Sequence, residues 1–335
     1  MFASKNAMTN HEILAGFIQK IPSEYPKHML CFFAANAARG NILPFTEGLL
    51  KCVGTIESAA PGYADEMFSR IAAITGKGED QFESIMEILC EIFVTAGAVE
   101  KADSEGGKIL FNHEPKRYGM NKPLKNPEFE VRFSGSWCGV EVKTPRLLNH
   151  SRSRASRPWQ FLDRSNPREV VHAFESTLPR ELAVKDFLIS AEAKFADYAL
   201  HRPDAFRLLV IVWDDFCQEP ISALLSPPSG LLTPNSFLSS NGKAVTFSNI
   251  DGIVIIRYQH QMARALSCSP LEDGLTETFC YHHKGFPPKA FISIPGGRNV
   301  PPPIMEGLNL VLLKECPGSE YGPAGYVMWT GGEES

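Results

Sequence analysis

The sequence NPEFEVRFSGSWCGVEVKTP, residues 126–145, predicts two neighbouring strands that carry charged side chains on one face. Side chains alternate along a strand, so Glu128 and Glu130 share a face of the first strand. In the same way, Glu141 and Lys143 share a face of the second strand. The Ser-Gly-Ser between the runs consists of turn residues and predicts a β-hairpin. Three carboxylates and one ammonium on one face are costly to desolvate together, and a hard divalent cation is their simplest partner.

A long helix is expected before the hairpin. Apolar residues recur with the helical period over residues 79–97, and Gly97 is the expected C-terminal stop. Glu83, Glu87 and Glu91 lie four residues apart and therefore line one face of this helix. A short strand over residues 108–112 is expected between the helix and the hairpin.

The other elements follow from the same patterns. The near-continuous apolar run at residues 206–214 is typical of a strand covered on both faces. Proline and glycine are frequent after residue 286, and only 308–313 has the pattern of a strand there. A further strand is expected over residues 250–258, and helices are expected over residues 11–21, 25–38, 45–55, 62–75 and 179–200.

Composition indicates a soluble globular protein in a reducing compartment. The chain has 335 residues, of which 44% are hydrophobic and 21% charged, with a formal net charge of −5. An anionic partner would therefore have to meet a local basic patch. The eight cysteines contain no CxxC pair, which favours reduced thiols in the cytoplasm. No apolar run is long enough to cross a membrane, and the first residues lack a signal-peptide core, so no membrane association is expected.

A segment rich in arginine, residues 146–168, follows the hairpin. It is expected to be a loop or to become ordered on binding. The usual role of such a run is a solvated linker, but its position beside the charged hairpin also favours contacts with phosphate. The candidate nucleic-acid-binding residues are Arg146, Arg152, Arg154 and Arg157, with Lys122 and Lys125 before the hairpin.

The order helix, strand, strand, strand, helix, strand resembles the PD-(D/E)xK nuclease superfamily. The matching motif halves are Pro127-Glu128 and Glu141-Val142-Lys143. The family usually has aspartate after the proline, and this chain has Glu128, whose extra methylene moves the carboxylate. The resemblance implies an α/β fold with a restriction-endonuclease-like αβββαβ core and a mixed sheet. This core would cover residues 79–215, between a helical N-terminal region at 1–78 and a C-terminal elaboration at 216–335.

The resemblance also implies an endonuclease that depends on Mg²⁺ or Mn²⁺. Phosphodiester hydrolysis needs a nucleophilic water, relief of charge on the phosphate and help for the leaving oxygen. By family likeness, Glu128 and Glu141 hold the metal with the backbone carbonyl of Val142. Lys143 would orient the water and offset charge on the phosphate. Glu87 would add a catalytic carboxylate from the preceding helix.

Several alternatives remain open at this stage. Glu83 and Glu91 are rivals of Glu87, and all three also fit an exposed helix face. DNA is favoured over RNA as the substrate by family base rates alone, and a homodimer is compatible with the sequence. The glutamate at position 128 and the acidic net charge also fit an inactive nuclease-like module that binds nucleic acid or a protein. An ordinary exposed hairpin in a helical interaction protein is the third reading.

Overall fold

The chain begins with five helices. The computed structural model describes residues 7–21, 28–115, 125–155, 159–163, 180–214 and 216–330. The observed helices agree to within a few residues with the ranges expected from the sequence. The exception is the second helix, which is shorter than expected, and residues 22–27, which include the start of its expected range, lie outside the described part. The five helices are α1 (Asn10–Lys20), α2 (Cys31–Ala38), α3 (Pro44–Ala59), α4 (Tyr63–Ala73) and α5 (Glu79–Glu100).

Helix α5 does not stop at Gly97, so that expectation was wrong. The helix continues to Glu100, and Gly97 is buried within it. A Cβ atom on Gly97 would lie 2.1 Å from Cγ of Tyr281, a distance that no real side chain tolerates. The glycine therefore serves close packing of an aromatic ring against the helix, rather than a turn out of it.

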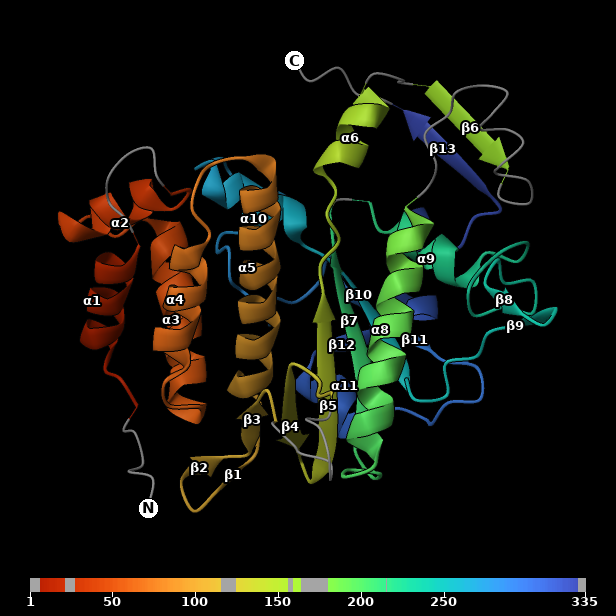
Figure 1. Cartoon of the computed structure of the whole chain (residues 1–335), viewed down its shortest axis with the longest axis horizontal. Helices are drawn as coiled ribbons and strands as arrows, with labels where there is room; N and C mark the ends of the chain where they lie inside the picture. The colour runs from red at the N-terminus through yellow and green to blue at the C-terminus, as the bar shows by residue number, and fades with distance from the viewer. Residues whose placement is uncertain are drawn as a thin grey trace.

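A seven-stranded sheet forms the centre of the molecule, as Figure 1 shows. Its order is β12-β11-β10-β7-β5-β4-β3. Strands β3, β4 and β5 pair antiparallel with one another in that order, and β5, β7 and β10 run parallel. Strand β11 is antiparallel to β10, and β12 is parallel to β11. The sheet is thus mixed, and the α/β expectation is confirmed at this level. The strands are β3 (Phe111–His113), β4 (Phe129–Phe133), β5 (Ser136–Lys143), β7 (Phe206–Trp213), β10 (Gly252–Arg257), β11 (Lys289–Ser293) and β12 (Leu310–Leu312).

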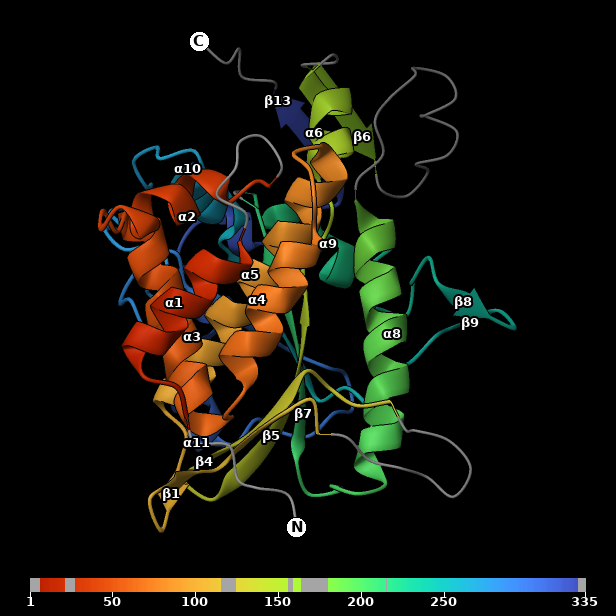
Figure 2. The same ribbon diagram turned by 60° about the vertical axis from the view of Figure 1, so that its left-hand side comes forward.

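Helices cover both faces of this sheet. Apolar side chains on one face of β4, β5, β7 and β10 pack with α1 to α5 and with α10 (Gln259–Leu266). The alternate side chains of β7, β10 and β11 pack with α8 (Glu181–Ala199) and α9 (Gln218–Leu225). Figures 1 and 2 show α5 and α8 on opposite sides of the strands. The connection from β5 to the parallel β7 contains α6 (Leu148–Ala155), β6 (Trp159–Asp163) and α8, and α8 is the helix that packs on the sheet as the crossover of parallel strands requires.

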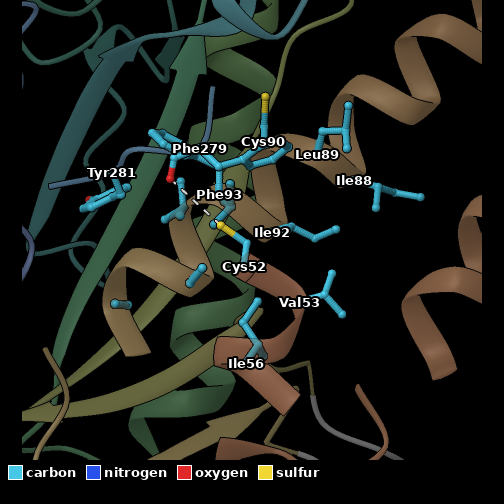
Figure 3. Packing of buried hydrophobic residues seen from close by; sticks show 14 of the residues in the cluster. Cys52, Val53, Ile56, Ile88, Leu89, Cys90, Ile92, Phe93, Phe279 and Tyr281 are labelled. Carbon is cyan, nitrogen blue, oxygen red and sulfur yellow. Dashed lines mark hydrogen bonds between the residues drawn. The ribbon is translucent and has the colours of Figure 1, made fainter. Parts of the chain in front are cut away.

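Figure 3 shows buried side chains of α3 and α5 packed in one cluster. Cys52, Val53 and Ile56 of α3 and the 88–93 segment of α5 belong to one buried cluster with Phe279 and Tyr281. The Phe93 ring stacks on Tyr258 with centroids 4.1 Å apart. This cluster also includes side chains of β4, β5 and β7, so helices and sheet share one apolar core.

The turn of the hairpin has the backbone that its residues predict. Phe133 pairs with Ser136, which leaves Ser134 and Gly135 as a two-residue loop. Both have positive φ, 42° and 88°, as a tight hairpin turn of the primed type requires. Ser136 therefore begins β5 instead of completing the turn.

Three expectations about strands and loops were wrong. The strand over residues 108–112 is divided into β2 (Lys108–Ile109) and β3, because the backbone N–H of Leu110 donates to the carbonyl of Asp103 between them. In the proline-rich C-terminal region, β11 and β13 (Tyr326–Thr330) are strands that the sequence pattern did not indicate. Part of the arginine-rich segment is regular: α6 (Leu148–Ala155) and β6 (Trp159–Asp163), which pairs with β13.

The remaining elements are short. None of the helices in the described part of the chain is both long and apolar enough to cross a membrane. A cytoplasmic location stays a prediction. The short elements are β1 (Ser104–Glu105), β8 (Ser239–Ser240), β9 (Lys243–Ala244), α11 (Pro302–Gly307) and two 3₁₀ turns at Leu313–Glu315 and Ser319–Tyr321.

A lysine is buried in the sheet, and its stability effect depends on pH. Lys289 of β11 is 1% exposed, with its Nζ 4.6 Å from the centre of the Tyr281 ring. Burial lowers the pKa of Lys289 to about 8, from an ordinary value of 10.5. Below pH 8 both folded and unfolded chains hold the proton, so the cost of burying the charge is fully present. Between the two values only the unfolded chain keeps the proton, and stability rises with pH.

Lys289→Met is therefore expected to raise the free energy of unfolding at pH 7 by about 2 kcal/mol. This net gain is the relieved cost of the buried charge minus the contribution of the lost cation–π contact. The gain should shrink as the pH approaches 10. Urea unfolding of both proteins at the two pH values measures it, with the exposed Lys243→Met as the control. A gain that is equal at pH 7 and pH 10 would contradict the assignment of the effect to the buried charge.

Candidate functional site

The hairpin brings two of the predicted acids opposite each other. Phe129 pairs with Val140 across β4 and β5, so the register continued by one residue sets Glu128 against Glu141. Glu128 directly precedes β4, and Glu141 lies within β5 beside Leu209 of β7. Because Leu209 packs in the cluster under α8, both glutamates lie on the face of the sheet that α8 covers.

One lysine of α8 bridges the two carboxylates. Lys194 Nζ lies 3.0 Å from Oε1 of Glu128 and 2.9 Å from Oε2 of Glu141. Lys143 Nζ lies 2.7 Å from the other oxygen of Glu141, Oε1. The Glu141 side chain is fully buried, whereas those of Glu128 and the two lysines keep about a fifth to a quarter of their surface exposed. These four side chains, Glu128, Glu141, Lys143 and Lys194, form what we call the Glu–Lys cluster.

Burial and charge act against each other in the Glu–Lys cluster. Burial raises the pKa of Glu141, the Glu128 charge raises it further, and the two lysines oppose both effects. Burial alone would lower the pKa of Lys194, but Glu141 and Glu128 outweigh it and raise that pKa above its usual value. The carboxylate pair thus strongly favours a cation between its oxygens.

The third acid of the hairpin face is held apart from the cluster. Glu130 accepts hydrogen bonds from Tyr198 Oη at 2.9 Å, Arg202 at 3.2 and 3.3 Å and Asn112 Nδ2 at 2.8 Å. Gly139 lies opposite Glu130, and a Cβ there would be 2.6 Å from the Tyr198 ring. The missing side chain lets the tyrosine reach the glutamate, and Glu130 has the contacts of a structural residue.

The Glu–Lys cluster borders a cavity of about 310 Å³. Side chains from α4, α5 and α8 surround it, together with Glu128 and the C-terminal end of β5. Both charges and apolar groups line it, and Lys143 reaches it from within the cluster. The lining residues are Arg70, Glu87, Ile88, Glu91, Glu128, Val142, Lys143, Thr144 and Phe187.

The three glutamates of α5 have different surroundings. Glu83 accepts from the backbone N–H of Leu148 at 3.0 Å and does not line the cavity. Glu91 is buried and accepts two hydrogen bonds from Arg70, at 3.1 and 3.0 Å. Glu87 lines the cavity, and its Oε1 lies 3.0 Å from Nε of Arg146. Of the three, Glu87 combines access to the cavity with the most exposed carboxylate, 41%.

The basic residues singled out in the sequence are only partly described. Arg146 and Arg152 are half exposed or more, and they pair with Glu87 and Glu79 of α5. These ion pairs are exposed to solvent, so they hold the start of the segment near α5 only weakly. Lys125 is exposed, and its backbone N–H donates to Asp197 of α8 at 3.0 Å. The side chain of Arg154, and all of Arg157 and Lys122, lie outside the described residues.

Two carboxylates converge on one point, and this arrangement fits a hard cation. Within the described ranges, no group of three or more His, Cys, Asp or Glu side chains is arranged to hold a metal ion. Mg²⁺ retains several waters, however, and is usually held by one or two carboxylates and substrate phosphate. Glu128 and Glu141 offer such a pair, because one nitrogen atom touches both. Val142, the proposed carbonyl ligand, lines the adjoining cavity.

Five cavity or cluster residues were neither predicted site residues nor named rivals: Arg70, Ile88, Thr144, Phe187 and Lys194. The four-residue spacing of Lys194, Tyr198 and Arg202 places them on one stripe along the end of α8 and the turn after it. Other charged residues of α8 show similar spacings, so this pattern alone does not mark Lys194. Arg70 comes from α4, outside the expected core, and no local pattern marks it. Phe187 belongs to α8 and has the pattern of a core residue.

Comparisons with known proteins do not identify this chain. It matches no protein-family model, no curated protein and no solved structure.

Proposed function

We propose that this chain is a nuclease that uses Mg²⁺ or Mn²⁺ to hydrolyse phosphodiester bonds, with DNA preferred over RNA. The observation that supports this most is the convergence of Glu128 and Glu141 on one nitrogen atom, with Lys143 2.7 Å from Glu141 at the wall of a cavity. Without the short β1 and β2 and the inserted α6 and β6, the element order is α5, β3, β4, β5, α8, β7. This is the αβββαβ order of the restriction-endonuclease-like core, and it supports that core for this chain.

Each residue of the site has a role in this proposal. Glu128 and Glu141 would hold the metal ion with the carbonyl of Val142, and a bound Mg²⁺ supplies charge relief for the phosphate. Lys143 Nζ, at the cavity wall, would donate hydrogen bonds to the attacking water and to a phosphate oxygen. Glu87 would accept a proton or a water hydrogen bond from the opposite wall. Arg146 beside it would meet the nucleic-acid backbone.

A second candidate is a metal-free module that binds nucleic acid or a protein. The observation in its favour is the Lys194 bridge, which neutralises both carboxylates without a metal. In this alternative the bridge is permanent and the chain cleaves nothing. An assay of DNA cleavage separates the two candidates.

The test is cleavage of supercoiled plasmid and of single-stranded DNA with Mg²⁺, with Mn²⁺ and with EDTA. We expect cleavage with either metal, none with EDTA, and a loss of about 100-fold in Lys143→Ala, comparable to removal of one transition-state donor. Arg202→Met is the control, because Arg202 also pairs with a hairpin glutamate but does not line the cavity. No cleavage under any metal condition, or equal rates for wild type and Lys143→Ala, would contradict the proposal.

A further inference from the structure

Lys194 occupies the point where the two carboxylates converge. Its ammonium is within 3.0 Å of both Glu128 and Glu141, and it lies 2.8 Å from the second oxygen of Glu141. The carboxylates of Glu128, just before β4, and Glu141, within β5, meet at one centre, and such a pair of oxygen ligands suits a cation. In this structure the cation of that site is the lysine.

We propose that Lys194 is an internal competitor of the divalent cation, and that its ammonium must leave the carboxylate pair before the cation can bind. This inference rests on the proposed function, because it takes Glu128 and Glu141 as the ligands. It assigns the site two forms, a resting form bridged by lysine and a loaded form with the lysine released.

Charge supports an exchange over simultaneous occupancy. With two glutamates and two lysines, the resting Glu–Lys cluster has no net charge. Adding a divalent cation beside both lysines would leave two uncompensated positive charges in a partly buried site, which is costly. With Lys194 gone, the site carries one net positive charge, which complements the single negative charge of a phosphodiester. The exchange thus couples cation binding to substrate binding.

The geometry of α8 allows this exchange. Lys194 keeps a quarter of its side chain exposed, and its unbranched four-carbon stem can carry the ammonium to solvent without movement of the helix. Tyr198, one turn further on, and Arg202, in the turn after α8, are bound to Glu130 and hold the end of α8 against the hairpin. The helix therefore does not depend on the lysine for its position.

The experiment is titration of full-length protein with MnCl₂ by calorimetry, in wild type, Lys194→Met and Arg202→Met. Methionine has nearly the length of lysine and no charge. We expect Mn²⁺ to bind Lys194→Met about tenfold more tightly than wild type, and the Mn²⁺-induced rise in Tm to be larger. Arg202→Met, which removes the cation of Glu130 on the same stripe, should bind Mn²⁺ within twofold of wild type.

A charge-preserving variant covers the case in which Lys194→Met does not fold. Lys194→Arg places a planar guanidinium between the carboxylates, can bond both at once and should weaken Mn²⁺ binding below that of wild type. Mn²⁺ affinity that is unchanged in both Lys194 variants would overturn the inference.

The outcomes separate this inference from the proposed function. Tighter Mn²⁺ binding by Lys194→Met without DNA cleavage by any form supports the competition and contradicts the nuclease. Cleavage by wild type with equal Mn²⁺ affinity in wild type and Lys194→Met supports the nuclease and overturns the competition. Absence of Mn²⁺ binding in every variant overturns both.

Discussion

Glu141→Gln is expected to lower the rate of DNA cleavage about 1,000-fold while the chain stays folded. Glutamine keeps the shape of the side chain but removes the charge that would hold a metal ion. The residue is 0% exposed and lies between two lysines, so no water can replace the lost carboxylate. Because burial already raises the pKa of Glu141, the neutral amide also removes a desolvation cost that offsets part of the lost ion pairs. Plasmid cleavage and thermal unfolding measure the two effects.

The matched control is Glu130→Gln. Glu130 lies on the same face of the hairpin and is equally buried, at 1% exposed. Its partners include Tyr198, Arg202 and Asn112, and it is not one of the two carboxylates that Lys194 bridges. Glu130→Gln should therefore cleave at nearly the wild-type rate. Wild-type cleavage by Glu141→Gln would contradict the assignment of the site, and equal losses in both variants would mean that any charge removed from this face is damaging.

Arg180→Met is expected to lower the free energy of unfolding by about 3–5 kcal/mol, the cost of breaking a buried ion pair from one side. Arg180 precedes α8 and is 4% exposed as a side chain. Its Nε donates to Glu219 of α9 at 2.6 Å, and its other end lies 2.9 Å from Asp214 after β7. The two carboxylates outweigh burial and raise the pKa of Arg180, which shows how strongly they favour its charge. Urea unfolding at pH 7 measures the loss.

The double variant Arg180→Met/Glu219→Gln tests the cause. Glu219 is 1% exposed, and without Arg180 its charge would lose its guanidinium partner in the interior. Removing that charge as well should recover more than half of the lost stability, because replacing both members of a buried pair costs far less than removing one. A double variant that is as unstable as Arg180→Met would mean that lost packing dominates instead of the buried charge.

Local patterns were sufficient to predict the hairpin and its charged face. Alternation over residues 126–145 predicted the two strands, and the structure buries Phe129, Val131 and Phe133 on the face opposite to Glu128 and Glu130. Strand alternation depends only on neighbouring residues, so it can be read without knowing the rest of the fold. The helices of the first hundred residues were predicted for the same reason.

The partners of the charged side chains could not be predicted in this way. Lys194 is 53 residues from Glu141, and Arg70 is 21 residues from Glu91. The sequence around Glu141 or Glu91 does not indicate which basic side chain, distant in the sequence, forms its ion pair. Gly97 shows the same limit, because a glycine near a helix end usually signals a stop, and only the distant ring of Tyr281 explains why a glycine lies inside this helix. Strand β13 pairs with β6 from the far end of the chain, another contact that local patterns do not reveal.

The stripe of Lys194, Tyr198 and Arg202 has a consequence for how the chain folds during synthesis. The hairpin leaves the ribosome well before α8. Until α8 follows, the hairpin acids have Lys143 and Asn112 as partners but lack Lys194, Tyr198 and Arg202. Like charges repel across an isolated hairpin, and a two-stranded hairpin is marginal in water even without such repulsion. We therefore expect β4 and β5 to reach a stable register only when residues up to Arg202 have emerged, so that the hairpin and α8 fold as one cooperative unit.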